Sequence, residues 1–373
     1  MNFNFIGRVL YMTIFTINKN RLYSFKYIEL YGNPMVLNFK NKGLQILLEF
    51  HYIKNKKSKS QNMKILLTST SFQDTPGSHH DLLLTRNYEI SRVRGPINEL
   101  KMLELIADYD AVLCGDDEYT RKVLEKGKNS KLKFVSKYGV GLDKIDLDAA
   151  KELGIPVTNC PGVNQVSVAE HVLALLFTFE KNIHLQYNTT QQGSWNRLIG
   201  NEVQGRTIGI IGLGAIGKVL ATKASALGLK VLGFDLYKDE SFLKANPSVT
   251  FVENTDDIFA NSDIISLHVP HTKTTEKMIN ASVIEEKIKK TPILINTSRG
   301  MLIDTDDVID ALDSGKLRGY LTDVLSHEPM REDDKLKGVD NVIITPHVGS
   351  RTYQSVVRQG TMAVQNLFKM IDA

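Results

Sequence analysis

Residues 207–218 read Thr-Ile-Gly-Ile-Ile-Gly-Leu-Gly-Ala-Ile-Gly-Lys, and this stretch decides the fold. An apolar run enters a G-x-G-x-x-G turn made by Gly212, Gly214 and Gly217, and helix-forming residues follow from Val219. The pattern predicts a strand, a tight turn and a helix start. Gly212 permits the turn, Gly214 lets the backbone approach a pyrophosphate, and Gly217 lets helix and strand pack closely. The free N–H groups of the helix start attract the anion.

A second apolar run, residues 230–234, ends in Asp235, 18 positions after Gly217 (235 − 217). An acid at this point can hold both ribose hydroxyls of an adenine nucleotide and would repel a 2′-phosphate. We therefore expect NAD rather than NADP as the cofactor, with Lys238 as the nearby residue that could accommodate a 2′-phosphate. The alternative is a glycine-rich turn without a ligand, and the two features in register favour the cofactor site.

The composition places the chain among soluble globular proteins. Its 373 residues allow two domains, and 42% hydrophobic and 24% charged residues are ordinary values. Cys114 and Cys160 lack metal-binding spacing, so we expect reduced, buried thiols in a cytoplasmic protein and no metal site. No run of about 18 apolar residues predicts a membrane-spanning helix.

Residues 1–62 differ from the rest of the chain. They carry ten Lys or Arg and two Glu, a net charge of +8, which leaves −4 for residues 63–373 out of the total of +4. The mildly acidic remainder gives no reason to expect a nucleic-acid partner. We interpret residues 1–62 as a leader of doubtful status, either upstream of a functional start at Met63 or a cleaved transit peptide, and exclude it from the fold.

From Met63, short apolar runs alternate with helical patterns, which predicts a parallel sheet covered by helices. A break at residues 159–162 ends this first domain. Ser167 and Glu170 then resemble a capping box that opens an apolar helix extending to about Leu185. The helix has more apolar residues than one buried stripe needs, so we expect a homodimer. The strands expected in the first domain are 64–69, 111–114, 133–136 and 155–159; its expected helices are 98–109 and 147–153.

The second domain is predicted to contain six strands, at 208–211, 231–235, 264–270, 292–297, 319–324 and 341–345. Ligands of open parallel sheets bind outside the carboxyl ends of the strands. The residues expected to meet there are Asp235, His268, Arg299, Asp323 and His347.

Three of these side chains form a coherent chemical set. Arg299 lies at a strand end beside Gly300, where a guanidinium can clamp a carboxylate. His347 can take or give a proton near neutral pH, and Glu328 can orient its other ring nitrogen and favour the protonated form. Each residue alone is as easily structural as catalytic, but together with a nicotinamide site they predict hydride transfer.

These motifs closely resemble those of the NAD-dependent D-isomer-specific 2-hydroxyacid dehydrogenases over residues 63–373. The resemblance implies an oxidoreductase of α/β class with two doubly wound parallel-sheet domains, a Rossmann NAD-binding domain inserted in a flavodoxin-like substrate domain. The implied boundaries are 63–162 with 347–373 for the substrate domain and 163–346 for the NAD-binding domain. The segments that carry the resemblance are 138–143, 193–195, 212–217, Asp235, 296–300, Asp323, Glu328 with Pro329, and 346–349.

By the same resemblance, Arg299 holds the substrate carboxylate, His347 is the general acid/base and Glu328 pairs with it. Val140 and Gly141 would help to bind substrate, and Asp323 would contact the nicotinamide amide. The implied cofactor-binding residues are Gly212, Gly214, Ala215, Ile216, Gly217, Asp235, Val269, Pro270, Thr297, Asp323 and Gly349.

Within this family the sequence is most similar to phosphoglycerate dehydrogenases in a short form without a regulatory domain, which implies serine biosynthesis. Where those enzymes place an Arg for the phosphate, however, this chain has Gly115, Asp116, Asp117 and Glu118. A general glyoxylate or hydroxypyruvate type of 2-keto acid reductase is therefore an alternative. A second alternative, from another class, is an NAD-sensing corepressor-like binding protein.

Overall fold

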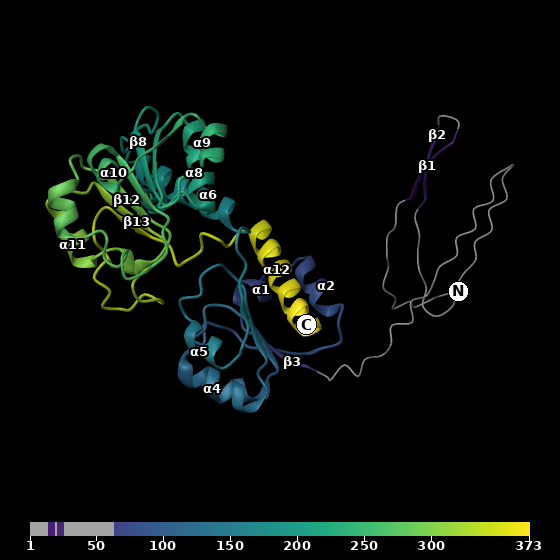
Figure 1. The fold of residues 1–373 in the computed structure, drawn as a ribbon. Coiled ribbons are helices and arrows are strands. Elements are labelled where there is room, and N and C mark those ends of the chain that lie inside the picture. Colours follow the sequence, from purple (N-terminus) through teal and green to yellow (C-terminus); the bar gives the residue numbers. More distant parts are fainter. Residues whose placement is uncertain (1–13, 19–20, 26–62) are drawn as a thin grey trace. The chain divides into compact units, whose positions relative to one another are not determined.

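The computed structural model describes residues 14–18, 21–25 and 63–373. Strands β1 (Ile14–Asn18) and β2 (Arg21–Phe25) pair in an antiparallel hairpin. The rest of the predicted leader, apart from these two strands, lies outside the described residues. Residues 62–373 form a separate compact unit that contains two parallel sheets, and the ribbon of Figure 1 traces both.

The first sheet has five parallel strands in the order β4-β3-β5-β6-β7. Numbered along this sheet, the order is 2-1-3-4-5, which is that of flavodoxin-like folds. Side chains alternate between its two faces: Ile65 and Leu67 pack with one hydrophobic cluster, and Leu66 packs with the other. The strands are β3 (Lys64–Leu67), β4 (Glu89–Arg92), β5 (Ala111–Cys114), β6 (Phe134–Lys137) and β7 (Val157–Thr158).

Helices cover both faces of this sheet. The helices are α1 (Thr70–Asp74), α2 (Ser78–Leu84), α3 (Glu99–Leu105), the 3₁₀ turn η1 (Ile106–Asp108), α4 (Arg121–Ser130), α5 (Leu147–Glu152) and α12 (Tyr353–Asp372). The C-terminal helix α12 lies beside α2 in Figure 1 and buries Val356, Ala363 and Leu367 in the same cluster as Ile65. Ser136 on β6 donates to the carbonyl of Ala363 at 2.8 Å, so the last helix of the chain completes the first sheet.

The second sheet has seven parallel strands in the order β10-β9-β8-β11-β12-β13-β14. The first six follow the order 3-2-1-4-5-6 of a Rossmann sheet, and the topological switch point lies between β8 and β11. The strands are β8 (Thr207–Ile211), β9 (Lys230–Phe234), β10 (Val249–Phe251), β11 (Ile264–Leu267), β12 (Ile293–Asn296), β13 (Gly319–Thr322) and β14 (Val342–Ile344).

The core of this sheet also has two halves. Ile208 and Ile210 of β8 pack with Leu176 and Leu220, whereas Ile211 packs with Phe259 on the opposite face. The helices are α6 (Gln165–Glu180), α7 (Ile183–Gln191), α8 (Ala215–Ala226), α9 (Glu240–Ala245), α10 (Thr255–Asn261) and α11 (Thr305–Asp313), with short turns η2 (Val283–Lys287) and η3 (Gly300–Leu302).

The predicted α/β fold class with two doubly wound parallel sheets is confirmed. In the two parallel sheets, strands β4 and β10 were missed, and both are edge strands. Their sequences, Glu-Ile-Ser-Arg and Val-Thr-Phe, are too short or too polar to give a strand signal. The domain boundaries drawn from the sequence stay a prediction.

The predicted capping box is wrong. Helix α6 begins at Gln165, so Ser167 lies inside the helix, where its hydroxyl donates to the carbonyl of Gly349 at 2.7 Å. Glu170 instead accepts a hydrogen bond from Lys223. The helix also ends at Glu180, because Asn182 adopts a left-handed conformation with φ of 53° between α6 and α7.

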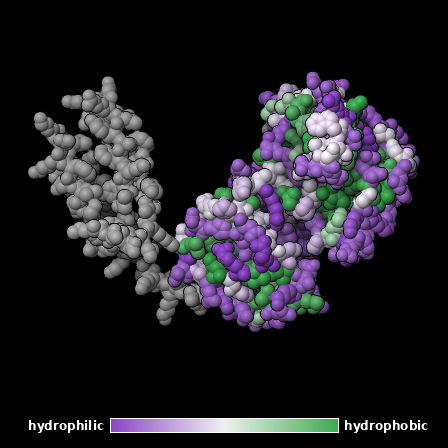
Figure 2. All heavy atoms as spheres, turned by 180° about the vertical axis from the view of Figure 1, so that it is seen from behind, coloured by the Kyte–Doolittle hydropathy of each residue, from purple (hydrophilic) through white to green (hydrophobic). Residues whose placement is uncertain are grey.

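The two cysteines, Cys114 and Cys160, are free and buried, as predicted. In the residues that the structure describes, no helix is long and apolar enough to cross a membrane. On the face drawn in Figure 2, hydrophobic residues are dispersed among hydrophilic ones.

Candidate active site

The fold requires glycine at two of the three glycine positions in the turn after β8. Gly212 has φ of +102°, and a Cβ there would lie 2.4 Å from the carbonyl oxygen of His268. A Cβ on Gly217 would lie 1.9 Å from the carbonyl oxygen of Gly212, so only glycine allows α8 to pack this closely. Gly214, in contrast, has nothing within 4 Å of its Cβ position. The start of α8, at Ala215 and Ile216, therefore faces open space, which suits a pyrophosphate.

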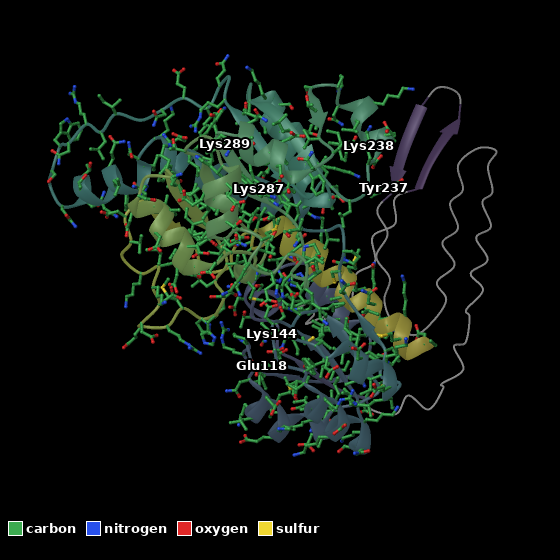
Figure 3. All side chains as sticks on the ribbon, turned by 60° about the vertical axis from the view of Figure 1, so that its left-hand side comes forward. Glu118, Lys144, Tyr237, Lys238, Lys287 and Lys289 are labelled. Carbon is green, nitrogen blue, oxygen red and sulfur yellow. The ribbon has the colours of Figure 1, made fainter. Side chains whose placement is uncertain are left out.

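The neighbouring strand ends also fit a dinucleotide. Asp235 follows β9 and is half-buried, with one oxygen accepting from the backbone N–H of Tyr237 at 3.2 Å. Lys238, labelled beside Tyr237 in Figure 3, lies 3.2 Å from Glu240 and above the ring of Phe251. Since its charge is already paired, Lys238 is poorly placed to attract a 2′-phosphate.

Further residues near the switch point follow β11 and β12. Val269 and Pro270 come directly after His268, whose carbonyl packs against Gly212. The hydroxyl of Thr297, just past β12, is buried and has no hydrogen-bond partner among the described residues. An unsatisfied buried hydroxyl beside an open glycine turn is consistent with a polar ligand at this edge. The residues present therefore fit NAD.

Arg299 is positioned by the turn that follows β12. Asn296 accepts from the backbone N–H of Ser298 and donates to the carbonyl of Arg299, at 3.1 and 2.8 Å. Gly300 is required next, because a Cβ there would lie 2.0 Å from the backbone carbon of Leu325. The turn that carries Arg299 is thus packed directly against the segment that leads to Glu328.

The guanidinium of Arg299 lies against the loop that follows β6. Its Nε donates to Asp143 Oδ2 at 2.7 Å, and its Nη2 lies 2.6 Å from the same oxygen. A Cβ on Gly141 would lie 1.8 Å from Nη2, so the glycine leaves space for the guanidinium. Val140 accepts a hydrogen bond from Asn159 through its carbonyl, which fixes the loop. Of the predicted substrate-binding residues, Gly141 and Arg299 are therefore in direct contact.

His347 and Glu328 form the predicted pair. His347 Nδ1 lies 2.8 Å from Glu328 Oε2, while Glu328 Oε1 accepts from the backbone N–H of Leu325. Partial burial lowers the pKa of His347, but the hydrogen bond to Glu328 and the charges of Glu328, Asp116 and Asp323 outweigh it, so the pKa lies above its usual value. The Nε2 atom is the ring nitrogen left for a ligand.

Asp323 holds the loop that carries His347. It is buried, and its oxygens accept from the hydroxyl of Thr345 and from the backbone N–H groups of Val348 and Gly349, at 2.6 to 2.9 Å. His347 itself has φ of +52°, a conformation that costs a side chain about 1–3 kcal/mol and must be enforced by its surroundings. Burial raises the pKa of Asp323, but the hydrogen bonds from these donors and from His171 outweigh burial. The pKa therefore lies below its usual value, and the carboxyl stays ionised.

One pair at this site was missed by the sequence reasoning. Lys137 ends β6 and is 4% exposed, and its Nζ lies 2.6 Å from Asp116 Oδ1. Partial desolvation raises the pKa of Asp116, but Lys137, His347 and Arg299 together lower it below its usual value. Asp116 is thus within electrostatic reach of both His347 and Arg299. The signal available was the position of Lys137 at the carboxyl end of a strand.

His268, which the sequence placed at the same edge, bonds to its own strand through Nε2, while its buried Nδ1 has no hydrogen-bond partner among the described residues. Its Nε2 lies 2.8 Å from the hydroxyl of Ser266, and burial lowers its pKa to about 4, so the ring is neutral. Within the part of the chain that the structure covers, no group of His, Cys, Asp or Glu side chains could hold a metal ion.

Comparisons with known proteins agree with this geometry. Residues 173–349 match the family model described as D-isomer specific 2-hydroxyacid dehydrogenase, NAD binding domain. A hydroxypyruvate reductase from Thermotoga maritima is 36% identical over 292 residues, which are 77% of this chain and 93% of that protein. The apo-structure of D-lactate dehydrogenase from Escherichia coli has a TM-score of 0.73 and 28% identity, over 83% of this chain and 97% of the other.

A D-3-phosphoglycerate dehydrogenase from Synechocystis sp. is 34% identical over 268 residues, which are 71% of this chain and 47% of that protein. The chain thus spans about half the length of this relative and nearly all of the hydroxypyruvate reductase. The motifs, the two sheets and these similarities agree. The chain belongs to the D-isomer specific 2-hydroxyacid dehydrogenase family, NAD-dependent oxidoreductases that act on the CH–OH group of their substrates.

Proposed function

We propose that this chain transfers hydride reversibly between NAD(H) and a small D-2-hydroxy or 2-keto acid. The observation that carries the proposal is the hydrogen-bonded pair of His347 and Glu328, 2.8 Å apart. Arg299 is beside Gly300, which packs against Leu325, and the N–H of Leu325 donates to Glu328 of that pair. The site thus offers a proton donor and an anion clamp within one small region.

Arg299 binds the substrate carboxylate. Its guanidinium lies against Gly141, where a glycine backbone lets a small acid approach closely. A charge-assisted contact of this kind fixes the orientation of a planar 2-keto acid as well as its affinity. The main-chain groups of Val140 and Gly141 complete the substrate contact.

His347 supplies and recovers the proton. In reduction, protonated Nε2 donates to the keto oxygen, and the ring becomes neutral while Nδ1 stays bonded to Glu328. In oxidation, neutral His347 takes the proton from the 2-hydroxyl. Glu328 keeps the ring oriented and favours its protonated form, and Asp323 fixes the backbone on which the ring stands.

When bound, NADH supplies the hydride for the carbonyl carbon. We assign its binding to the residues at the carboxyl edge of the second sheet. The glycine turn with Ala215 and Ile216 would take the pyrophosphate, and Asp235 would take the adenine ribose. The remaining proposed contacts at this edge are Val269, Pro270, Thr297, Asp323 and Gly349.

A spectrophotometric assay tests the function. The full chain is mixed with NADH and hydroxypyruvate, phosphohydroxypyruvate, glyoxylate or pyruvate, and loss of NADH absorbance is followed. We expect turnover with at least one acid, and we expect His347→Ala to lower kcat by about 10²–10⁴-fold while NADH affinity changes little. Unchanged kcat in His347→Ala would contradict the proton-transfer role.

The corepressor-like alternative makes the opposite prediction. A binding protein would bind NADH, turn over none of the acids and recruit a protein partner in an NADH-dependent way. The preserved Arg299, Glu328 and His347 geometry favours the enzyme, so this alternative comes forward only when NADH binds and all four acids remain unreduced.

We further propose that the chain forms a homodimer and acts in the cytoplasm. Helix α7 and the segment after it expose large apolar side chains, namely Ile183, Leu185, Tyr187, Trp195, Leu198 and Ile199. An apolar surface of this extent favours a second copy as its partner. Light scattering of the purified protein tests the dimer, and the free thiols of Cys114 and Cys160 support a reducing compartment.

A further inference from the structure

The acidic run Asp116-Asp117-Glu118 lies at the carboxyl end of β5, and its three carboxylates serve different purposes. Asp117 is 1% exposed and points into the fold, where it accepts from the backbone N–H groups of Ile97 and Gly115 and from the hydroxyl of Thr68. Burial raises the pKa of Asp117. This residue fastens the loop to the first sheet.

Glu118 is also engaged elsewhere. It accepts from the backbone N–H of Glu99 at the start of α3, at 2.9 Å, and lies 3.7 Å from Lys144. Figure 3 shows Glu118 and Lys144 together. Two of the three acids therefore stabilise the loop, and Asp116 is the one whose side chain stays mostly exposed.

Asp116 is held by a buried cation. Lys137 donates to the carbonyl of Gly115 and to Asp116 Oδ1, at 2.5 and 2.6 Å, while 73% of the Asp116 side chain remains exposed. The carboxylate is thus fixed on one side and open on the other. Lys137 Nζ also lies 3.9 Å from the Cβ position of Gly139, in the same loop whose Gly141 contacts Arg299, so Asp116 is held at the edge where the keto acid would bind.

Three cationic groups of the site each have an acidic partner. Lys137 faces Asp116, Arg299 faces Asp143, and protonated His347 faces Glu328. A substrate monoanion adds one negative charge, for which Arg299 is shared with Asp143. A phosphorylated acid would bring a further charge of about −1.5 to −2 next to Asp116. Arg351, four residues beyond His347, donates to the hydroxyl of Thr70 at the start of α1.

Resting on the function proposed above, we propose that Asp116 determines substrate class. It accepts a hydrogen bond from a hydroxyl on the carbon next to the keto group, and it excludes an anionic group from that position. The substrate is then an unphosphorylated 3-hydroxy-2-keto acid rather than a phosphate ester. Lys137 is the positioning residue that keeps Asp116 ionised and in place.

The test compares three acids that differ only at that carbon: pyruvate, hydroxypyruvate and phosphohydroxypyruvate. For the full chain with saturating NADH, we expect kcat/KM to favour hydroxypyruvate over each of the others by at least about tenfold. In Asp116→Asn, which keeps the shape but not the charge, we expect the ratio of phosphohydroxypyruvate to hydroxypyruvate to rise by about tenfold or more. The advantage of hydroxypyruvate over pyruvate should shrink in the same variant.

Glu118→Gln is the matched control. Glu118 is two residues after Asp116 and carries the same charge, but its side chain contacts Glu99 and Lys144. Its substrate ratio should stay within about twofold of the starting protein. NADH affinity and thermal unfolding are measured for each variant to check that the cofactor site and the fold are intact. A starting protein that prefers the phosphate ester, or an unchanged ratio in Asp116→Asn, overturns the proposal.

Failure of the proposed function gives a different result. In that case none of the three acids is reduced, and their binding to the protein–NADH complex is measured by NADH fluorescence. Tighter binding of hydroxypyruvate than of its phosphate ester, lost in Asp116→Asn, supports the role of Asp116 even then. Equal binding of the two acids, or binding of neither, overturns it.

Discussion

Arg299 and Asp143 are joined side-on, with Nε and Nη2 of the guanidinium 2.7 and 2.6 Å from one carboxylate oxygen. Asp143 belongs to the loop after β6 of the first sheet, and Arg299 follows β12 of the second. The guanidinium Nη1 also donates to the carbonyl of Ser298. The residue proposed to bind the substrate carboxylate is therefore fixed by its own turn and by the loop that contributes Gly141.

Replacing Asp143 by Asn should weaken substrate binding. The variant keeps an acceptor for Nε but removes the charge that orients the guanidinium. Because both side chains are about one-third exposed, we expect a loss of only about 1 kcal/mol, or about a fivefold rise in KM for the keto acid. Steady-state kinetics measure KM, and kcat and NADH affinity should change less.

Asp148→Asn is the control for that variant, since Asp148 is an exposed acid in the first turn of α5. It removes the same charge and should leave KM unaffected. A KM that falls in Asp143→Asn would mean that Asp143 competes with the substrate for Arg299 and does not position it.

The pH dependence of reduction should follow His347. Its pKa lies above the usual 6.5, and the protonated ring is the form that donates to the keto oxygen. The rate of reduction is therefore expected to be high at acidic pH and to fall as pH rises through the raised pKa. Oxidation, which needs the neutral ring, should show the opposite trend. Profiles of kcat/KM against pH in both directions measure the midpoint.

Glu328→Gln should move that midpoint to lower pH. Without the carboxylate, the partial burial of His347 remains and lowers its pKa. At neutral pH the fraction of protonated His347 falls, so reduction should slow more than oxidation. An unshifted midpoint in this variant would assign the titration to another group.

Most of the fold could be predicted from the sequence because central parallel strands are buried on both faces. Such strands, for example 264–267 and 293–296, are short uninterrupted apolar runs that only a covered sheet explains. Edge strands carry less of this signal, which is why 89–92 and 249–251 were missed. The capping box failed for a different reason: Ser167 is needed inside the helix to hold Gly349, a contact that local sequence does not reveal.

The site was predictable in part for the same reason. Arg299 and His347 lie just past strand ends, close to Gly300 and Gly349. Both belong to motifs that can be recognised by their order along the sequence. Contacts with the first sheet could not be read from the sequence: Asp143, which orients Arg299, is 156 residues from it, and Lys137 is 21 residues from its partner Asp116. Such contacts depend on how loops pack, so the sequence placed Asp116, Asp117 and Glu118 alike where a phosphate would lie, whereas Asp117 is buried in the fold.

Cofactor choice is expected to depend on Asp235. In Asp235→Ser the acceptor for the ribose hydroxyls is lost together with the charge that repels a 2′-phosphate. We expect the preference for NADH over NADPH to fall by about ten- to a hundredfold, read as the ratio of kcat/KM values with the same keto acid. Lys238→Gln should have little effect, because Lys238 is paired with Glu240. A large loss of NADPH use in Lys238→Gln would reverse that assignment.

Two glycines of the same turn should respond in opposite ways to alanine. Gly214 has φ of −70° and nothing within 4 Å of its Cβ position, so Gly214→Ala should fold normally. Its methyl group would occupy the space through which a pyrophosphate approaches, and NADH affinity should fall by tenfold or more, an effect of about 1.4 kcal/mol.

In Gly217→Ala the added carbon would lie 1.9 Å from the carbonyl oxygen of Gly212, so the helix must shift. The free energy of unfolding should fall by about 1–3 kcal/mol before any ligand is added. Denaturant unfolding and NADH titration of both variants separate the two effects, and a destabilised Gly214→Ala with normal NADH binding would contradict the placement of the cofactor.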